Sequence, residues 1–315
     1  MRIIFMGTPE FAVPTLEGLI RSGYEVCLVV TQPDKPKGRG HKILPGPVKE
    51  IALKYGIDIF QPDKVKNKRF TDTLRSYNAD LIVTAAYGRL LTKQALECAR
   101  LGCINVHASL LPKYRGAAPL WRVLINGENK TGVTIMYTDE GMDTGDMIDV
   151  AEFDIPEDMT VGQLNNELSE LGAKTLLKTL DKLKTGKAGR IKQNDDEATY
   201  APPIDKSEGL IKWEASAEQI HNLVRGTNPW PVAYTFFNEE RMKIFRTIVV
   251  DSNKFNEAKP GTILDVDDNG ILVKTGNGSI LIKELQFNSS KKMDVKDYIR
   301  GHVVEKGDIL RQSAE

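Results

Sequence analysis

Residues 2–30 read RIIFMGTPEFAVPTLEGLIRSGYEVCLVV, and this stretch decides the fold class. Residues 2–6 form a short apolar run, residues 7–9 form a Gly-Thr-Pro turn, and residues 11–20 carry apolar side chains near helical spacing. Residues 24–30 are apolar again, as expected for the next strand. The pattern predicts a strand–helix–strand unit whose two strands run parallel.

The same alternation continues through the first two-thirds of the chain. Further strands are expected at residues 58–60, 81–85, 103–107 and 133–137, with helices at 48–54, 70–77, 93–99 and 119–126. Residues 146–155 would add an extended edge strand, and residues 161–183 a long closing helix. We therefore expect an α/β fold with a Rossmann-like, mostly parallel sheet and helices on both faces. Ligands of such sheets lie at the carboxyl ends of the strands.

The pattern changes after residue 205. A helix is expected at residues 217–224, and short strands at 232–237, 242–250, 262–266, 271–274 and 279–285. Residues 268–270 and 276–278 are hairpin-turn signals between the later strands. These signals predict a small antiparallel β-barrel. We place the first domain at residues 1–189, a linker at 190–205 and the second domain at 206–315.

Composition limits the possible functions. The chain has 315 residues, 41% of them hydrophobic, and its 43 basic residues balance 43 acidic ones. This length allows two cored domains. Because the net charge is zero, contacts with nucleic acid must come from local clusters. Apolar runs fall short of the ~20 residues that span a bilayer, so we expect a cytoplasmic protein that makes no membrane contact.

The sequence also argues against several cofactors. Cys27, Cys98 and Cys103 form no Cys-x-x-Cys pair of the kind that binds zinc or exchanges electrons. We expect three reduced thiols, mostly buried. The turn at residues 7–9 is not a Gly-x-Gly-x-x-Gly fingerprint, and the chain has no Walker lysine motif. A nicotinamide or nucleoside-triphosphate cofactor is therefore not expected.

Three polar residues stand where two strands would end. Asn105 and His107 are two residues apart, so both side chains point to one face of the strand at 103–107. Asp143 follows the strand expected at 133–137. An amide and an imidazolium can hold a developing oxyanion, while a carboxylate favours the charged imidazole and moves a proton. The trio suits acyl transfer to an amine, although a strand histidine is often a packed core residue and Asp143 could serve only as a turn residue.

The wider pattern resembles a known family. The motifs are NVHASLLP at residues 105–112, RGAAP at 115–119 and DEGMDTG at 139–145, and they look like the signature of formyltransferases that use 10-formyltetrahydrofolate. This resemblance implies that Asn105, His107 and Asp143 are catalytic, that 10-formyltetrahydrofolate is the co-substrate, and that no metal is needed. The resemblance also implies a set of folate-binding residues: Ser109, Leu110, Leu111, Pro112, Arg89, Leu91 and Asp139.

Residues 32–49 form a long loop, interrupted by proline and glycine, after the second strand. Its basic residues are Lys35, Lys37, Arg39, Lys42 and Lys49, and its single acid is Asp34. A loop of this length inside a compact domain is usually functional or disordered, and its charges suit phosphate backbones. The alternative is a solvated surface loop.

Together with FMGTPEFAVP at 5–14, AAYG at 85–88 and GVTIM at 132–136, this loop resembles the branch of the family that formylates methionine carried by tRNA. The resemblance runs over nearly the whole chain. It implies initiator methionyl-tRNA as the partner, an OB-like, tRNA-binding second domain, and a monomer. The implied tRNA contacts are Lys35, Lys37, Arg39, Lys42 and Lys206.

Other formyltransferases are the alternatives. An enzyme acting on glycinamide ribonucleotide would share Asn105, His107 and Asp143, but it needs neither the second domain nor the basic loop. An enzyme acting on an amino sugar nucleotide, or a formyltetrahydrofolate hydrolase domain, would share the two-domain layout. From another class, a catalytically inactive RNA-binding protein would bind RNA without folate. The loop and the complete catalytic trio argue against these alternatives.

Overall fold

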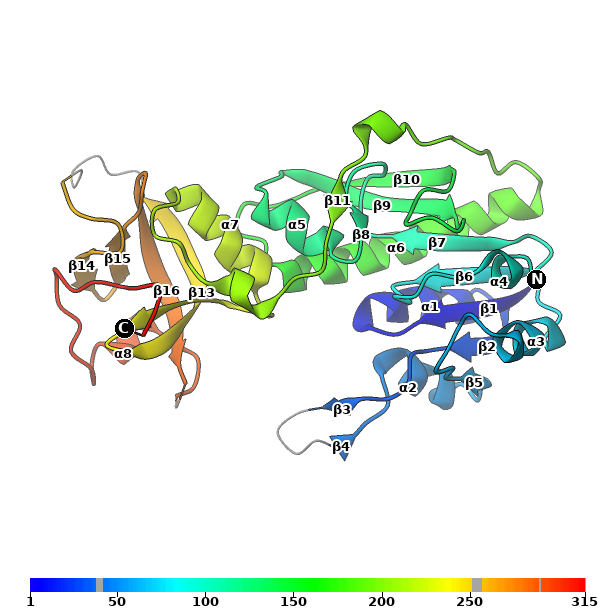
Figure 1. Cartoon of the computed structure of the whole chain (residues 1–315), viewed down its shortest axis with the longest axis horizontal. Helices are drawn as coiled ribbons and strands as arrows, with labels where there is room; N and C mark the ends of the chain where they lie inside the picture. Colours follow the sequence, from blue (N-terminus) through cyan, green and yellow to red (C-terminus); the bar gives the residue numbers. More distant parts are fainter. Residues whose placement is uncertain (38–41, 251–256, 289, 315) are drawn as a thin grey trace. The chain divides into compact units, whose positions relative to one another are not determined.

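The computed structural model describes residues 1–37, 42–250, 257–288 and 290–314 (Figure 1). The described chain separates into two compact units. Unit 1 contains Met1–Pro119, Lys130–Asp154 and Asn165–Pro202, and unit 2 contains Leu120–Asn129, Ile155–Leu164 and Pro203–Glu315. Each unit therefore includes segments that are far apart in the sequence. The domain bounds expected from the sequence stay a prediction.

Unit 1 is built on a seven-stranded sheet. Its order is β10 (Met147–Asp154), β9 (Lys130–Tyr137), β7 (Cys103–His107), β6 (Leu81–Ala85), β1 (Arg2–Gly7), β2 (Glu25–Val30) and β5 (Ile59–Phe60). The five strands from β7 to β5 pair in parallel, whereas β9 runs antiparallel to β7 and β10 antiparallel to β9. The predicted Rossmann-like, mostly parallel sheet is confirmed.

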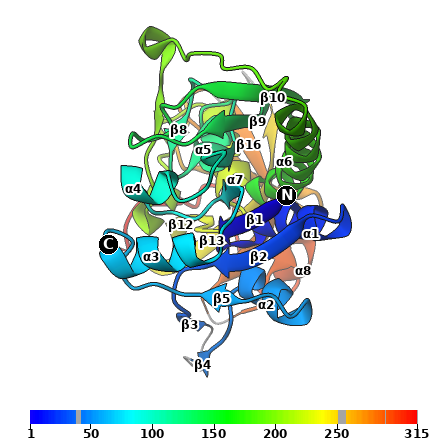
Figure 2. The same ribbon diagram turned by 90° about the vertical axis from the view of Figure 1, so that its right-hand side faces the viewer.

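Helices cover both faces of this sheet (Figure 2). On one face, Phe70 and Leu74 of α3 (Lys68–Ser76) pack with Ile4 and Met6 of β1 in a common apolar core. On the other face lie α1 (Val13–Arg21) and α6 (Val161–Lys184). Gly172 of α6 allows this packing, because a Cβ there would stand only 2.7 Å from the Val106 side chain of β7.

Local chemistry explains how the helices of unit 1 begin and end. The helix expected at 11–20 begins as a 3-10 turn, η1 (Glu10–Ala12), before α1. Helix α3 begins at Lys68, earlier than expected, because the Asn67 side chain caps it and accepts from the Phe70 amide at 2.9 Å. The expected helix at 93–99 is only α4 (Lys93–Leu96). Helix α2 (Pro47–Lys54) of unit 1, and helix α5 (Pro119–Ile125), which belongs to unit 2 from its second residue on, match their predicted positions within a few residues.

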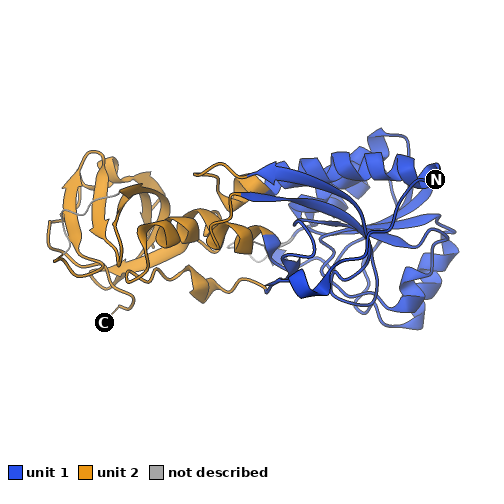
Figure 3. Ribbon diagram, turned by 90° about the horizontal axis from the view of Figure 1, so that it is seen from above, with its two compact units in different colours: residues 1–119, 130–154, 165–202 blue, residues 120–129, 155–164, 203–315 orange. Residues whose placement is uncertain are grey.

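Unit 2 contains a six-stranded antiparallel sheet (Figure 3). Its strands are β12 (Ala233–Phe237), β13 (Glu240–Val250), β16 (Ser279–Phe287), β15 (Gly270–Lys274) and β14 (Ile263–Asp267) in spatial order, with β17 (Met293–Asp294) on β16. The five longer strands confirm the predicted ones. Residues 293–294 were not expected to form a strand, because two residues give no periodic signal.

The chain end closes this sheet into an OB-like barrel. Arg311 exchanges two backbone hydrogen bonds with Phe236 of β12, and the Leu310 amide donates to Gly261 beside β14. Both edge strands of the sheet thereby gain a partner. The helix α7 (Ala217–Thr227) starts at a capping box between Ser216 and Gln219. A short helix, α8 (Val295–Tyr298), completes the unit.

The structure also bears on the expected state of the cysteines and on the possibility of a membrane-spanning helix. All three cysteines are free, as expected, but only Cys103 is buried. Cys27 and Cys98 are half-buried, so the expectation of mostly buried thiols is wrong for them. In the part of the chain that the structure describes, every helix is too short or too polar to cross a membrane.

Candidate active site

Asn105 and His107 lie on β7, where strand alternation places them on one face. Thr84 of β6 is the register partner of Asn105, and its hydroxyl donates to Asn105 Oδ1 at 2.8 Å. This bond fixes the amide so that Nδ2 points the other way. Among the described residues, no hydrogen bond takes up Nδ2, which leaves it available to a substrate oxygen.

The two nitrogens of His107 have different partners. Nε2 lies 3.1 Å from the carbonyl oxygen of Tyr114, and a carbonyl only accepts, so Nε2 carries a proton. Nδ1 lies 3.7 Å from Asp143 Oδ2. Tyr114 has a left-handed backbone with φ of 59°, which directs its carbonyl toward the ring. With 5% of its surface exposed, His107 is held in one orientation.

Asp143 is held by the turn that follows the 105–112 motif. Its Oδ2 accepts from the Gly116 amide at 2.8 Å, and its backbone is left-handed with φ of 56°, a conformation that aspartate tolerates. Gly116 is required there, because a Cβ would stand 2.8 Å from the Ala201 carbonyl oxygen. The carboxylate therefore reaches His107 while keeping a backbone donor of its own.

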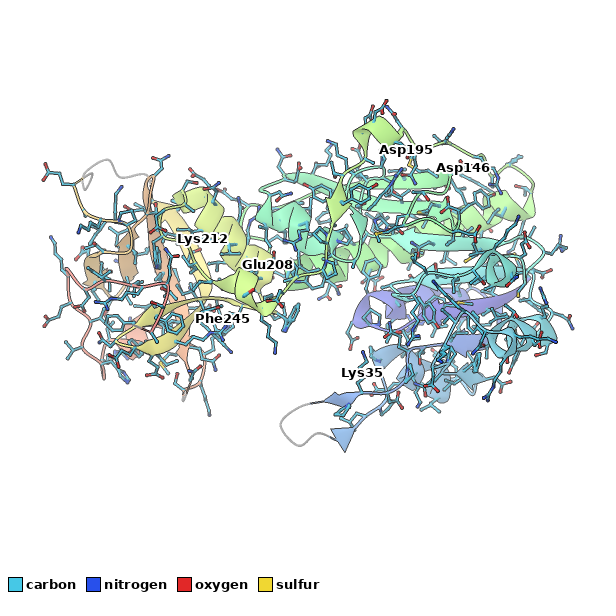
Figure 4. All side chains as sticks on the ribbon, viewed as in Figure 1. Lys35, Asp146, Asp195, Glu208, Lys212 and Phe245 are labelled. Carbon is cyan, nitrogen blue, oxygen red and sulfur yellow. The ribbon has the colours of Figure 1, made fainter. Side chains whose placement is uncertain are left out.

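A buried glutamine fixes the backbone around Asp143. Gln193 Nε2 donates to the carbonyls of Asp143 at 2.8 Å and Gly145 at 2.7 Å. Its Oε1 accepts twice from the Arg115 guanidinium, at 3.0 and 2.8 Å, and Arg115 also pairs with Asp195 at 2.8 Å. Gln193 and Asp195 belong to the segment expected as a linker, yet this part of it packs within unit 1. Asp195 is labelled in Figure 4.

Thr134 of β9 fixes the segment 109–112 through two hydrogen bonds. The Thr134 hydroxyl donates to the Ser109 carbonyl at 2.7 Å and accepts from the Leu111 amide at 3.1 Å. Thr134 is fully buried, so no water can replace these bonds. The Ser109 side chain is also engaged, since its hydroxyl donates to the Lys113 carbonyl at 2.7 Å.

We expect Thr134→Val to loosen this segment. Valine keeps the shape but leaves a buried carbonyl and a buried amide unpaired, which should lower the free energy of unfolding by about 1–3 kcal/mol. The affinity of this segment for a bound ligand should fall severalfold. Thr131→Val is the matched control, because Thr131 lies buried on the same strand and makes no side-chain hydrogen bond among the described residues. Equal effects of the two substitutions on ligand affinity would contradict the role given to Thr134.

The predicted folate residues fall into two groups. Ser109, Leu110, Leu111 and Pro112 directly follow Asn105 and His107 in the sequence and are fixed to β9 by Thr134. The other three are occupied elsewhere: Arg89 Nη1 donates to the Asp63 carbonyl at 2.8 Å, the Leu91 side chain lies in the core, and the Asp139 carboxylate accepts from Thr144 at 2.8 Å.

The predicted tRNA residues are placed only in part. Lys35 is exposed on the segment leading into the hairpin of β3 (Pro36–Lys37) and β4 (Lys42–Ile43) (Figure 4). The backbones of Lys37 and Lys42 pair across that hairpin. Arg39 and the side chains of Lys37 and Lys42 lie outside the described residues. Lys206 is exposed in unit 2 on η3 (Lys206–Gly209).

A cleft of about 520 Å³ opens at the carboxyl ends of β1, β2 and β6. Sheets of this kind bind ligands where the strand order reverses, and here that point lies between β1 and β6. The sequence pattern predicted this edge of the sheet but not the lining residues. They are Thr8, Pro9, Glu10, Thr31, Gln32, Pro33, Asp34, Lys35, Leu44, Gly46, Pro47 and Ala86.

Several supporting residues could not be found from the sequence motifs. Thr84 and Thr134 could have been noticed in the sequence, because each places a hydroxyl among the apolar residues of a strand. No sequence feature marks Gln193, because it stands in a polar segment with little apolar periodicity. Within the described residues, no group of three or more His, Cys, Asp or Glu side chains could hold a metal ion.

Comparison with known proteins places this fold and site in a family. The family described as "Formyl transferase" matches residues 1–180, and "Formyl transferase, C-terminal domain" matches residues 203–303. A protein of Ruminiclostridium cellulolyticum named methionyl-tRNA formyltransferase is 55% identical over 98% of this chain and 99% of its own length. Its namesake from Acetivibrio thermocellus is 54% identical over 99% of this chain and all of its own length.

Solved structures share the fold. The sugar 3N-formyl transferase WlaRD aligns with a TM-score of 0.64 and 21% identity, over 92% of this chain and 99% of that one. HypX from Aquifex aeolicus, solved with tetrahydrofolic acid, aligns with a TM-score of 0.64 and 18% identity, over 95% of this chain and 47% of that one. The chain belongs to the formyl transferase family. It is an enzyme that transfers formyl groups.

Proposed function

We propose that this enzyme transfers the formyl group of 10-formyltetrahydrofolate to the amino group of methionine on initiator tRNA. The observation that carries the proposal is the meeting of Asn105, His107 and Asp143 at the carboxyl end of β7. The acceptor is supported by relatives named methionyl-tRNA formyltransferase, which are 46–55% identical over nearly the whole chain. The products are tetrahydrofolate and formylmethionyl-tRNA.

Two donors would hold the oxygen of the formyl group as the amine attacks its carbon. Asn105 contributes Nδ2, because Thr84 already occupies its Oδ1. His107 contributes Nδ1, because the Tyr114 carbonyl occupies Nε2. With Nε2 protonated, Nδ1 can donate only when the ring is an imidazolium. The Asp143 carboxylate, 3.7 Å away, faces that ring with the opposite charge.

Asp143 would also handle the proton of the amine. A neutral amine that adds to a formyl carbon becomes cationic and must lose a proton before the folate nitrogen can leave. The Asp143 carboxylate would accept this proton directly or through water, while Gly116 keeps it in place. The same proton would then pass to the folate nitrogen as its bond to the formyl carbon breaks, which gives neutral tetrahydrofolate and the formylated amine. We assign the folate to the side of the site formed by Ser109, Leu110, Leu111 and Pro112, with backbone contacts at Arg89, Leu91 and Asp139.

We assign the formyl-transfer site to residues 1–189 and tRNA contacts to residues 206–315, joined by a linker at 190–205. The outer face of β12 and β13 supports a nucleic-acid role, because the Arg241 guanidinium lies 3.6 Å from the Tyr234 ring centre and Lys243 pairs in register with Tyr234. Stacked aromatic and basic side chains suit RNA. We further propose that the enzyme works in the cytoplasm as a monomer.

The decisive experiment compares acceptors. The purified protein is given 10-formyltetrahydrofolate and, separately, charged initiator tRNA, charged elongator methionine tRNA and glycinamide ribonucleotide. The proposal expects rapid formylation of the initiator species, and slow or no formylation of the others. Preference for glycinamide ribonucleotide, or for an amino sugar nucleotide added as a fourth acceptor, would overturn it.

Salt dependence tests the basic loop. Replacing Arg39 and Lys42 with alanine should weaken binding of charged tRNA and flatten its dependence on salt. Each lost phosphate contact should reduce the slope of log affinity against log salt concentration by about 0.7–0.9. The measurement is tRNA binding between low and moderate salt, without folate. An unchanged slope would remove these two residues from the tRNA interface.

A further inference from the structure

Three side chains form a closed ring where the basic loop leaves the sheet of unit 1. Lys49 Nζ contacts Asp34 Oδ2 and donates to Gln61 Oε1 at 2.7 Å. Gln61 Nε2 in turn donates to Asp34 Oδ1 at 2.9 Å. Asp34 lies on the outgoing stem of the loop, Lys49 lies in the first turn of α2 where the loop returns, and Gln61 follows β5. The ring therefore joins both stems to the edge of the sheet.

The ring is connected to the ends of three strands. Gln61 Nε2 also donates to the carbonyl of Gln32, at 2.9 Å. The Gln32 side chain donates through Nε2 to the Tyr87 carbonyl beyond β6, at 2.9 Å. The Gln32 backbone N–H donates to the Thr8 hydroxyl beyond β1, at 3.1 Å. The root of the loop is thus fixed to the strand ends that form the cleft.

The charges in the ring are poorly suited to direct tRNA contact. Asp34 is negative, so it would repel a polyanion. The side chains of Lys49 and Asp34 are only 20% and 19% exposed, and each faces the other. Lys49 also stands in the first turn of α2, where the helix dipole disfavours a cation. The hydrogen bond from Lys49 is the main reason why the pKa of Asp34 lies below its ordinary value. Asp34 is therefore ionised at neutral pH, and the ion pair with Lys49 persists there.

We propose that Asp34, Lys49 and Gln61 form a clasp that ties together the two stems of the basic loop, residues 34–36 and 44–49, and positions these stems for the charged tRNA. The proposal rests on the proposed acceptor. Several residues of the two stems line the cleft, so the clasp also fixes one wall of it. The three residues act through the loop and the cleft wall, which makes them positioning residues for acceptor binding and leaves the chemistry to β7.

The substitution Asp34→Asn gives the sharpest test, because two explanations predict opposite signs. If charge alone mattered, removing a negative group near a polyanion would lower the KM for tRNA. The clasp predicts that this KM rises about tenfold, because the new amide presents a donor to the Lys49 ammonium and opens the ring. The kcat and the KM for 10-formyltetrahydrofolate should change less than about twofold, since the β7 site is untouched.

Two further variants complete the design. Lys49→Met should raise the KM for tRNA as Asp34→Asn does, and the double variant should be no worse than either single one, because both break one unit. Lys54→Met is the matched control. It removes a lysine from the same helix, and that lysine is 62% exposed and outside the ring. An unchanged or lowered KM in Asp34→Asn, or an equal rise in Lys54→Met, would overturn the clasp.

Limited trypsin digestion separates the clasp from the proposed function. Opening the root should speed cleavage after Lys37 or Lys42 by about tenfold in Asp34→Asn at unchanged thermal stability, whatever the acceptor is. Wild-type cleavage rates in that variant would count against the clasp. Faster cleavage of Asp34→Asn, together with no activity of the wild-type protein on methionyl-tRNA, would support the clasp as the structure that holds the loop. The same result would overturn the proposal that methionyl-tRNA is the acceptor.

Discussion

His107→Ala should lower the rate of formyl transfer by about 100- to 1000-fold, the usual cost of losing one oxyanion donor. Asn105→Ala should do the same, because its Nδ2 is the other donor and Thr84 occupies its remaining oxygen. Neither change should weaken tRNA binding. The measurement is single-turnover formylation with enzyme in excess, which separates the chemical step from product release.

Asp143→Asn tests the charge opposite His107. Asparagine can still accept from the Gly116 amide, so the turn should survive, but it cannot balance an imidazolium or accept a proton. We expect a loss of about 100- to 10,000-fold in the same assay. Combining it with His107→Ala should add little, since groups that act as a unit are not additive.

Glu140→Gln is the matched control for Asp143→Asn. Glu140 lies in the same loop and carries the same charge, but it is exposed and its side chain makes no hydrogen bond or ion pair within the described residues. Its turnover should remain within about threefold of wild type, as for a surface substitution. Normal turnover in His107→Ala, or an equal loss in Glu140→Gln, would contradict the mechanism.

The sheet of unit 1 was predictable because strands and helices alternate with clear apolar periods. The direction of β9 and β10 was not, since an apolar strand reads the same in a parallel or an antiparallel pair. A barrel was predicted for unit 2, but the residues that close it were not. Its closure depends on single backbone contacts of Leu310 and Arg311, which no sequence period records.

The candidate site was likewise predictable only in part. Spacing alone placed Asn105 and His107 on one face, because strand geometry fixes alternate side chains. Which nitrogen of His107 faces Asp143 depends on the Tyr114 carbonyl, and that depends on a left-handed backbone at a non-glycine residue. The clasp was equally hidden, because Asp34, Lys49 and Gln61 meet only after the sheet has formed.

Gln193→Leu should cause the largest loss of local stability. Leucine nearly matches glutamine in size but leaves the carbonyls of Asp143 and Gly145 unpaired and removes an acceptor from the buried Arg115 guanidinium. Since each unpaired buried group costs about 1–3 kcal/mol, the free energy of opening the Asp143 loop should fall by about 3 kcal/mol or more. The kcat should fall about tenfold, because Asp143 is no longer held at His107.

Native-state hydrogen exchange is the suitable measurement, because a two-unit chain need not unfold in one step. Peptides covering residues 137–147 should exchange faster, while peptides from the β12–β16 barrel should be unchanged. All three tryptophans, Trp121, Trp213 and Trp230, belong to unit 2, so their emission gives an internal check that the barrel is intact. Lys192→Ala, at the exposed neighbour, should change neither readout. If Gln193→Leu left exchange and kcat as in wild type, residues 190–202 would be a passive connection and the support given to Asp143 would be wrong.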